Sequence, residues 1–226
     1  MPELIRDQIY QKIKREILSG VYQQGEQLSA NQLAGRNDIS ATPVREALNA
    51  LEQEGFIEVI PRIGFFVARV TSKDVRDIYE FRIIIEGASA EMAAVRITDK
   101  ELAYIAEIPS DYVMGDTESY LEYLKNNREF HLSIAKSSRN QFLAKTVEMI
   151  LDQTQRMVFL GIGSSEHTDA ILQAHPRLVA ALRKRDPEES RRTMIEGIVA
   201  ARDAAIQQII HGSSVAVHPS ETAQTG

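Results

Sequence analysis

Apolar residues recur every three or four positions through the first fifty residues of the chain, which is the spacing that buries one face of a helix. The first helix is predicted over residues 4–19, and four isoleucines form its buried face: Ile5, Ile9, Ile13 and Ile17. A short helix is predicted next, with Ser29 as its N-cap. A third helix opens at Ser40 or Thr42 and carries Pro43 in its first turn.

The pattern changes from helical to strand-like after Gly55. Residues 56–60 and residues 65–70 are predicted strands, and the four residues between them, 61–64, form a turn. Three short helices followed by two strands and a tight turn are typical of a winged helix-turn-helix. Residues 1–70 are therefore predicted to form a DNA-binding domain of that type.

From residue 72 onward the pattern is helical almost throughout. The first of these helices starts near Asp74, and its predicted apolar face consists of Ile78, Phe81, Ile85 and Ala88. A capping box of Thr98 with Glu101 marks the start of the second. Including this second helix, the other five are predicted at about 99–108, 116–137, 140–160, 168–184 and 187–210.

The predicted fold class is mostly α. An N-terminal winged helix-turn-helix is followed by an all-α domain of six helices over residues 72–211. The final stretch, residues 212–226, is small and polar, and we expect it to be a disordered tail.

Composition narrows the class of protein. The 226 residues include no Cys, which excludes disulfides and thiolate metal sites. The start of the chain is charged throughout, unlike a signal peptide, and no apolar run is long enough to span a bilayer. We therefore expect a cytoplasmic protein without a membrane partner.

Charge limits how the chain can meet nucleic acid. The net charge is −6, and residues 1–70 hold 8 Lys and Arg against 9 Asp and Glu. DNA contact must therefore come from a few placed cations rather than from a general basic coat.

The segment from Leu28 to Val67 resembles the DNA-binding domain of the GntR superfamily of bacterial transcription regulators. The resemblance is carried by Ser40, the run Thr42-Pro43-Val44-Arg45-Glu46-Ala47-Leu48, then Leu51, Gly55 and Gly64-Phe65-Phe66-Val67. It implies that the helix from Ser40 enters the major groove, where Arg45 is suited to a bidentate contact with guanine. The candidate DNA-binding residues are Ser29, Thr42, Pro43, Arg45, Asn49, Arg62 and Gly64. The alternative for Arg45 is a surface salt bridge with Glu46 or another neighbour.

The chain departs from the family pattern at two places. Family members often carry Glu-Arg where this chain has Ala30-Asn31, and Arg where it has Ala41. Two commonly used DNA-contacting arginines are therefore absent, and we expect weaker or differently specified binding.

Residues 72–210 resemble the all-helical, effector-binding domain of the FadR-type branch, an FCD-like domain. The resemblance rests on Tyr79-Glu80-Phe81-Arg82 with Glu86, on Asn127-Arg128-Glu129-Phe130-His131, and on His175 through Asp186. Six helices are similar to the VanR-like subgroup. The resemblance implies that the effector is a small organic acid. It also implies that the protein is a homodimer, with a tetramer as the alternative.

Many such domains bind a divalent metal through an Asp, a His four residues later and two further His. The corresponding positions here are Asn127, His131, His175 and Gly197. Asn is a poor ligand for zinc or nickel, and Gly provides none. We therefore favour Asn127, His131 and His175 as effector-pocket residues, with a metal at His131 and His175 as the alternative.

Arg82 is the other candidate for effector binding. An Arg in the central cavity offers a fork for a carboxylate. Pairing with Glu86, four residues later on the same helix, is the alternative, and Arg82 can use both partners.

These residues indicate a ligand-responsive DNA-binding regulator, most simply a repressor that reads a pseudo-palindromic operator as a dimer. Two alternatives stay open: a regulator with a vestigial pocket, and a metal-dependent enzyme with His131 as general base. We expect no enzymatic activity, because no nucleophile-base pair or cofactor loop is evident.

Overall fold

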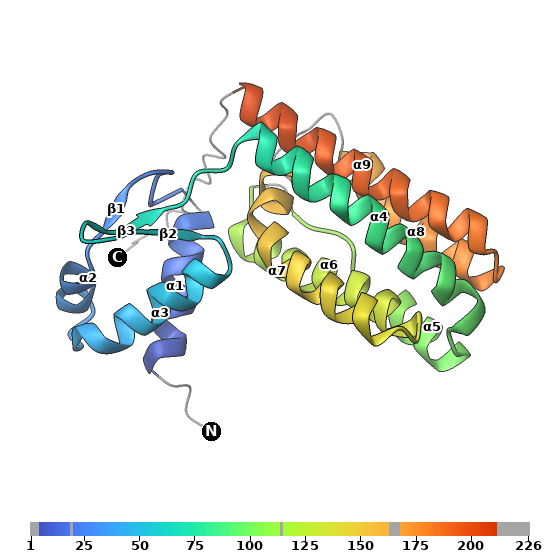
Figure 1. The fold of residues 1–226 in the computed structure, drawn as a ribbon, viewed down its shortest axis with the longest axis horizontal. Coiled ribbons are helices and arrows are strands. Elements are labelled where there is room, and N and C mark those ends of the chain that lie inside the picture. The colour runs from blue at the N-terminus through green and yellow to red at the C-terminus, as the bar shows by residue number, and fades with distance from the viewer. Residues whose placement is uncertain (1–4, 19, 114, 163–167, 212–226) are drawn as a thin grey trace, which may run out of the picture.

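The computed structural model describes residues 5–18, 20–113, 115–162 and 168–211 (Figure 1). Nine helices and three strands occupy these described residues, which confirms the mostly α fold class. The predicted tail, residues 212–226, lies outside them.

The N-terminal elements form a winged helix-turn-helix, gathered at one end of the helical part of the chain (Figure 1). They are α1 (Ile5–Leu18), β1 (Gln27–Leu28), α2 (Ala30–Arg36), α3 (Ala41–Gln53), β2 (Ile57–Ile60) and β3 (Gly64–Val67). The strands form an antiparallel sheet in the order β1-β3-β2. The predicted wing strands correspond to β2 and β3. Strand β1 was not predicted, because two residues are too few to show a period.

Local signals explain where these elements start and turn. The hydroxyl of Ser29 accepts a hydrogen bond from the backbone N–H of Gln32 and caps α2. Gly55 follows α3 with φ +76°, a left-handed conformation that glycine adopts without steric cost. The turn between β2 and β3 contains two further positive φ values, at Arg62 and Gly64.

Six helices follow in the described residues, at the predicted places. They are α4 (Ser72–Arg96), α5 (Asp99–Ala106), α6 (Thr117–Ser137), α7 (Gln141–Ile162), α8 (Thr168–Arg183) and α9 (Pro187–His211). Helix α4 begins with a capping box of Thr71 and Asp74, and α5 begins with the predicted box of Thr98 and Glu101. The two longest helices, α4 and α9, lie alongside each other (Figure 1). No helix of the described residues is both long and apolar enough to cross a bilayer.

The predicted inner face of α4 was partly wrong. Phe81 is 40% exposed, whereas Tyr79, Arg82 and Glu86 are at most 1% exposed. Helix α4 packs against α6, α7, α8 and α9, so its buried surface is wide and includes two charged side chains. Periodicity identifies which residues share a face, but the packing partners decide which face turns inward.

The core of the winged helix-turn-helix continues into the helical part. Apolar residues of α1, α2 and α3 belong to one buried cluster with residues of the later helices: Tyr120, Tyr123, Leu124, Val158, Ile171 and Ala204. At the same junction Arg15 on α1 pairs with Glu118 on α6, at 2.7 Å between Nε and Oε1. The winged helix-turn-helix is therefore packed, through α1, against α6, one of the helices that line the cavity described below.

Candidate functional site

The start of α3 presents polar side chains to solvent. Thr42, Arg45 and Asn49 are exposed, while the opposite face of the helix is fully buried: Val44, Ala47, Leu48 and Leu51. The structure shows no ion pair at Arg45 with any described residue, so the predicted alternative of a salt bridge with Glu46 is not observed. The guanidinium of Arg45 is thus available to an external partner.

Two further candidates, Ser29 and Pro43, have a structural role in the helix-turn-helix. Ser29 is half-buried and its hydroxyl caps α2, and Pro43 is the third residue of α3, where the missing N–H needs no intrahelical partner. Both residues therefore stabilise the backbone of the helix-turn-helix instead of extending a side chain into solvent.

The wing tip is held in one conformation. Arg62 is exposed with φ +67°, and Gly64 has φ +137°. The Gln27 side chain on β1 donates from Nε2 to the Ile63 carbonyl at 3.1 Å, and a Cβ added at Gly64 would lie 3.3 Å from that nitrogen. The hydrogen bond fixes the turn that carries Arg62.

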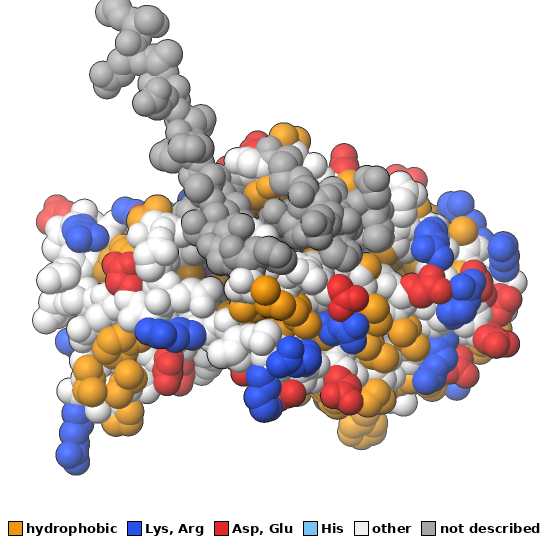
Figure 2. Space-filling model, turned by 90° about the horizontal axis from the view of Figure 1, so that it is seen from above, with side chains coloured by type: hydrophobic (Ala, Val, Ile, Leu, Met, Phe, Trp, Pro, Cys, Tyr) orange, Lys and Arg blue, Asp and Glu red, His pale blue; other side chains and the backbone are white. Residues whose placement is uncertain are grey.

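Charges of both signs are mixed over the helical part of the surface (Figure 2). No broad basic coat is visible on that face, in keeping with the net charge of −6. This agrees with the expectation that a few placed cations carry any DNA contact.

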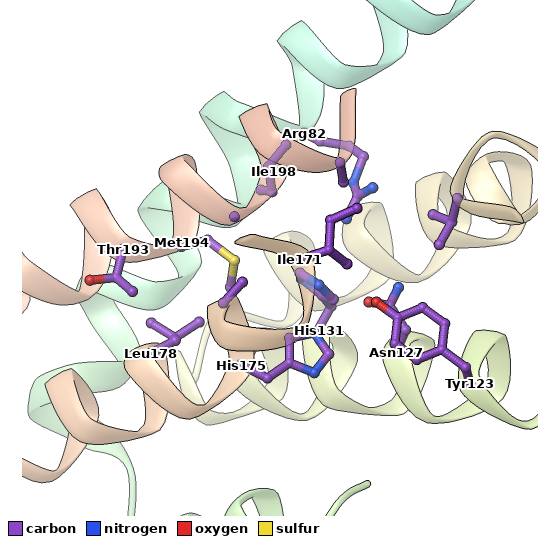
Figure 3. Close-up of a pocket in the computed structure, with 14 residues that line it drawn as sticks. Arg82, Tyr123, Asn127, His131, Ile171, His175, Leu178, Thr193, Met194 and Ile198 are labelled. Atoms are coloured by element: carbon purple, nitrogen blue, oxygen red, sulfur yellow. The ribbon is translucent and has the colours of Figure 1, made fainter. Parts of the chain in front are cut away.

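The four predicted effector residues meet at one cavity of about 30 Å³ between the helices (Figure 3). Arg82 comes from α4, Asn127 and His131 from α6, and His175 from α8. The rest of the lining is mostly apolar and consists of Tyr123, Val158, Ile171, Ala174, Leu178, Thr193, Met194, Gly197, Ile198 and Ala201. Arg82 and His175, which are 93 positions apart in the chain, thus line the same cavity.

A buried charged network forms the polar end of the cavity. Arg82 donates from Nε to Oε1 of Glu86 at 2.5 Å, and Oε2 of Glu86 lies 2.5 Å from Nδ1 of His131. Burial by itself would raise the pKa of Glu86, but the charge of Arg82 and the contact with His131 outweigh it and hold that pKa at about 2. Glu86 is therefore a carboxylate that compensates the charge of Arg82.

The predicted pairing of Arg82 with Glu86 is thus observed, but it uses only part of the guanidinium. Nη1 of Arg82 is buried and has no hydrogen-bond partner among the described residues. The same is true of Nδ1 of His175, whose ring stacks on Phe130 at 3.8 Å between centroids. A buried polar atom without a hydrogen-bond partner lowers the stability of the folded protein by about 1–3 kcal/mol. We therefore expect both atoms to bind a ligand or a water molecule.

The electrostatics of His175 differ from those of Glu86. Burial, and then electrostatic interactions with His131 and Arg82, lower the pKa of His175 well below its ordinary value. His175 is therefore a neutral imidazole at physiological pH.

The residues do not fit the zinc or nickel site considered from the sequence. A Cβ added at Gly197 would lie 2.9 Å from Cβ of Ala174, so α8 and α9 pack too closely there to accept a histidine. Nδ1 of His131 already faces Glu86. Among the described residues no group of three His, Asp or Glu side chains is arranged to hold a metal ion.

Sequence reasoning missed the link between Glu86 and His131. The two residues are 45 positions apart and on different helices, so no local spacing connects them. It did name Glu86 as the i+4 partner of Arg82.

Comparison with protein families gives two adjoining matches. Residues 5–67 match the family described as bacterial regulatory proteins, gntR family, and residues 77–200 match the FCD domain. The first match contains the helix-turn-helix and wing. The second contains the helices and residues of the cavity.

Individual relatives are also transcriptional regulators. An uncharacterized HTH-type transcriptional regulator of Bacillus subtilis, YdhC, is 27% identical over 191 residues, 83% of this chain and 85% of that protein. The Nta operon transcriptional regulator of Aminobacter aminovorans is 33% identical over 132 residues, 58% of this chain and 63% of that protein.

A solved structure shows the same fold. The E. coli protein McbR/YncC superimposes with a TM-score of 0.68 at 24% identity, covering 91% of this chain and 99% of that one. The relatives are regulators rather than enzymes, which argues against the metal-dependent enzyme. The chain belongs to the GntR family of bacterial regulatory proteins, as a DNA-binding transcription regulator that carries an FCD domain.

Proposed function

We propose that this chain is a ligand-responsive repressor, which binds a pseudo-palindromic operator as a homodimer and is controlled by a small organic acid. Residues 1–70 read the DNA. Residues 72–211 hold the effector and supply the dimer contact. The protein acts in the cytoplasm.

The exposed start of α3 supports the DNA-reading part of the proposal. Arg45 is free to contact guanine O6 and N7 in the major groove, with Thr42 and Asn49 beside it. In this proposal the wing tip, with Arg62 and Gly64, approaches the minor groove. One recognition helix reads only a few base pairs, so two-fold symmetry doubles the readout.

A relative supports repression as the direction of control. RspR of E. coli, named an HTH-type transcriptional repressor, is 24% identical over 193 residues, which are 85% of each chain. Repression requires only that the protein occupy its operator and leave it when the effector binds.

The observation that carries the effector part is the unpartnered Nη1 of Arg82, which lines the cavity between the helices. A guanidinium donor satisfies a carboxylate oxygen with a charge-assisted hydrogen bond. The cavity also borders the N-terminal core, because Tyr123, Val158 and Ile171 belong both to its lining and to the cluster that includes α1 and α3. A ligand that moves these side chains therefore acts on the packing of the DNA-reading elements.

The test is fluorescence anisotropy on DNA from just upstream of the gene, at two salt concentrations, with and without a pool of small carboxylates. We expect saturable, salt-sensitive binding that one member of the pool relieves. Arg45→Ala should weaken operator binding about tenfold or more, by loss of one bidentate contact. Arg183→Ala, which removes an exposed arginine at the end of α8, is the matched control and should change nothing.

A saturable complex that ignores every carboxylate would instead support the vestigial pocket. Equal losses for Arg45→Ala and Arg183→Ala would contradict the assignment of α3 as the reading helix. The mass of the complex, from light scattering, distinguishes a dimer on one operator from a tetramer.

A further inference from the structure

We propose that the cavity is a metal-free site for a short aliphatic monocarboxylate, whose carboxylate group is held directly by Nη1 of Arg82 and the imidazole of His175. The inference rests on the proposed function and specifies its effector. It follows from four properties of the cavity.

The space for a metal is closed by helix packing. The family resemblance implies a further histidine ligand at position 197, where this chain has glycine. At Gly197, α9 lies directly against Ala174 of α8. Asn127 adds a neutral amide where an acidic ligand is implied. A divalent cation would therefore meet too few ligands and too little negative charge.

The available polar atoms are suited to an anion. Glu86 is the acidic side chain of the network, and both its oxygens already face Arg82 and His131. The buried atoms without a hydrogen-bond partner here, among the described residues, are Nη1 of Arg82, Nδ1 of His175 and the Tyr79 hydroxyl, together with Oε2 of Glu86 and Nδ1 of His131, which face each other at 2.5 Å. The guanidinium nitrogen can only donate, and a neutral imidazole can donate from either nitrogen. A carboxylate accepts from both.

The three charged or ionisable side chains come from different helices and converge on one space (Figure 3). Arg82 extends from α4, His131 from α6 and His175 from α8. The stacking of His175 on Phe130 and the pairing of Arg82 with Glu86 fix both donors before a ligand arrives. A preorganised pair of donors reduces the entropy lost on binding.

Size and lining define the remainder of the ligand. A cavity of about 30 Å³ on this measure is larger than the space of one water but small for a drug-sized molecule. Beyond the polar end, its walls are mostly aliphatic, with Tyr123 and Thr193 as exceptions: Val158, Ile171, Leu178, Met194 and Ile198. A second carboxylate would be buried mostly against aliphatic side chains and would find no second cation among them, at a large desolvation cost. The site therefore favours a chain of a few carbons with one carboxylate over di- and tricarboxylates.

The experiment is calorimetric titration of the full chain, purified with EDTA, with propionate, butyrate, succinate and citrate. Propionamide, which has nearly the shape of propionate but no charge, is the matched ligand control. Zinc and nickel are titrated separately. We expect propionate or butyrate to bind in EDTA, the other three compounds to bind at least tenfold more weakly, and neither metal to bind at one ion per chain or to strengthen carboxylate binding.

The variant for this site is His175→Phe, because phenylalanine preserves the stacking on Phe130 and removes the ring nitrogens. We expect it to weaken propionate binding about tenfold or more, through loss of a hydrogen bond to a charged group. Tyr104→Phe, at an exposed site on α5 outside the lining of the cavity, removes one hydroxyl that donates to Glu129 at the surface and should leave affinity unchanged. Both variants are checked for folding by circular dichroism and for operator binding by anisotropy.

The outcomes separate the two proposals. If carboxylates bind only after zinc or nickel is added, or if citrate binds more tightly than butyrate, the metal-free monocarboxylate site is wrong. The proposal of an organic-acid effector would still stand in either case. Unchanged affinity in a folded His175→Phe protein would overturn the role of His175. If operator DNA binds and no carboxylate binds with or without metal, both this inference and the effector part of the proposed function fail.

Discussion

Oε2 of Glu86 on α4 lies 2.5 Å from Nδ1 of His131 on α6, and the same carboxylate neutralises Arg82. Glu86 is 1% exposed, so this contact joins two helices through a fully buried charge. The network has a structural role, because it compensates the guanidinium, and a functional one, because it orients the guanidinium and leaves Nη1 free.

Replacement of Glu86 by Gln should destabilise the fold. The charge of Arg82 would remain buried without compensation, which in buried pairs typically costs about 3–5 kcal/mol. Urea denaturation should show this loss. Glu91→Gln on the same helix is the matched control, because Glu91 pairs with Arg191 at the surface and such exposed pairs contribute at most about 1 kcal/mol. Equal losses for the two variants would show that the buried network contributes no more than a surface pair.

Acid should destabilise the protein through His175. Its pKa is lowered in the folded state, so below the ordinary value of about 6.5 the unfolded chain binds a proton that the folded chain does not. Stability should therefore fall as the pH decreases through that value. The charged or ionisable groups near His175 are Arg82 and Glu86 on α4 and His131 on α6.

Urea denaturation from pH 8 to pH 5 tests this. His175→Phe should show a flatter dependence over that range, and an unchanged slope would contradict the assignment. Glu86 acts at lower pH: its folded pKa of about 2 lies below the unfolded value, so its contribution is lost as the pH falls from about 4.5 towards 2.

A designed arginine should strengthen DNA binding. Ala41 is the first residue of α3, where family members often carry arginine. Ala41→Arg should raise operator affinity and steepen the salt dependence by about 0.9 in the slope of log affinity against log salt, for one added phosphate contact. Gln53→Arg adds the same charge at the other end of α3 and should leave the slope unchanged. Anisotropy over a salt series compares the three proteins, and equal slopes would argue against a phosphate near residue 41.

Gly197→Ala should destabilise the helical part despite the better helix propensity of alanine. The added methyl group would meet Cβ of Ala174 at 2.9 Å, and overpacking of this kind costs about 1–3 kcal/mol. Gly35→Ala on α2 is the control, because nothing lies within 4 Å of its added Cβ, and it should stabilise by about 0.5–1 kcal/mol. Thermal unfolding measures both. A stabilised Gly197→Ala protein would mean that α8 and α9 can separate, which would reopen the space for a larger ligand.

Much of the fold was predictable because its signals are local. The caps at Ser29, Thr71 and Thr98 lie within three residues of the groups they bind, so the sequence marks those helix starts directly. The turn before Gly64 is likewise a property of four consecutive residues. Strand β1 lacked such a signal, since its two residues are a strand only because β3 pairs with them.

The candidate site was predictable only in part. The sequence and its family resemblance determined that Arg82, Asn127, His131 and His175 belong together, and the structure places all four around one cavity. The exposed position of Phe81 could not be derived, because helical periodicity does not say how many neighbours a helix will have.

By itself, then, the sequence determined the helices and the wing, which depend on near neighbours in the chain, and its family resemblance indicated the residues of the pocket. Only the tertiary structure decided that Glu86 binds Arg82 and faces His131, that Nη1 of Arg82 is left without a partner, and that Gly197 closes the space for a metal against Ala174. These relationships join residues 4, 23 and 45 positions apart or leave one atom unpaired. They exist only once α4, α6, α8 and α9 have packed, because close packing brings distant side chains within contact distance and excludes the water that would otherwise satisfy them.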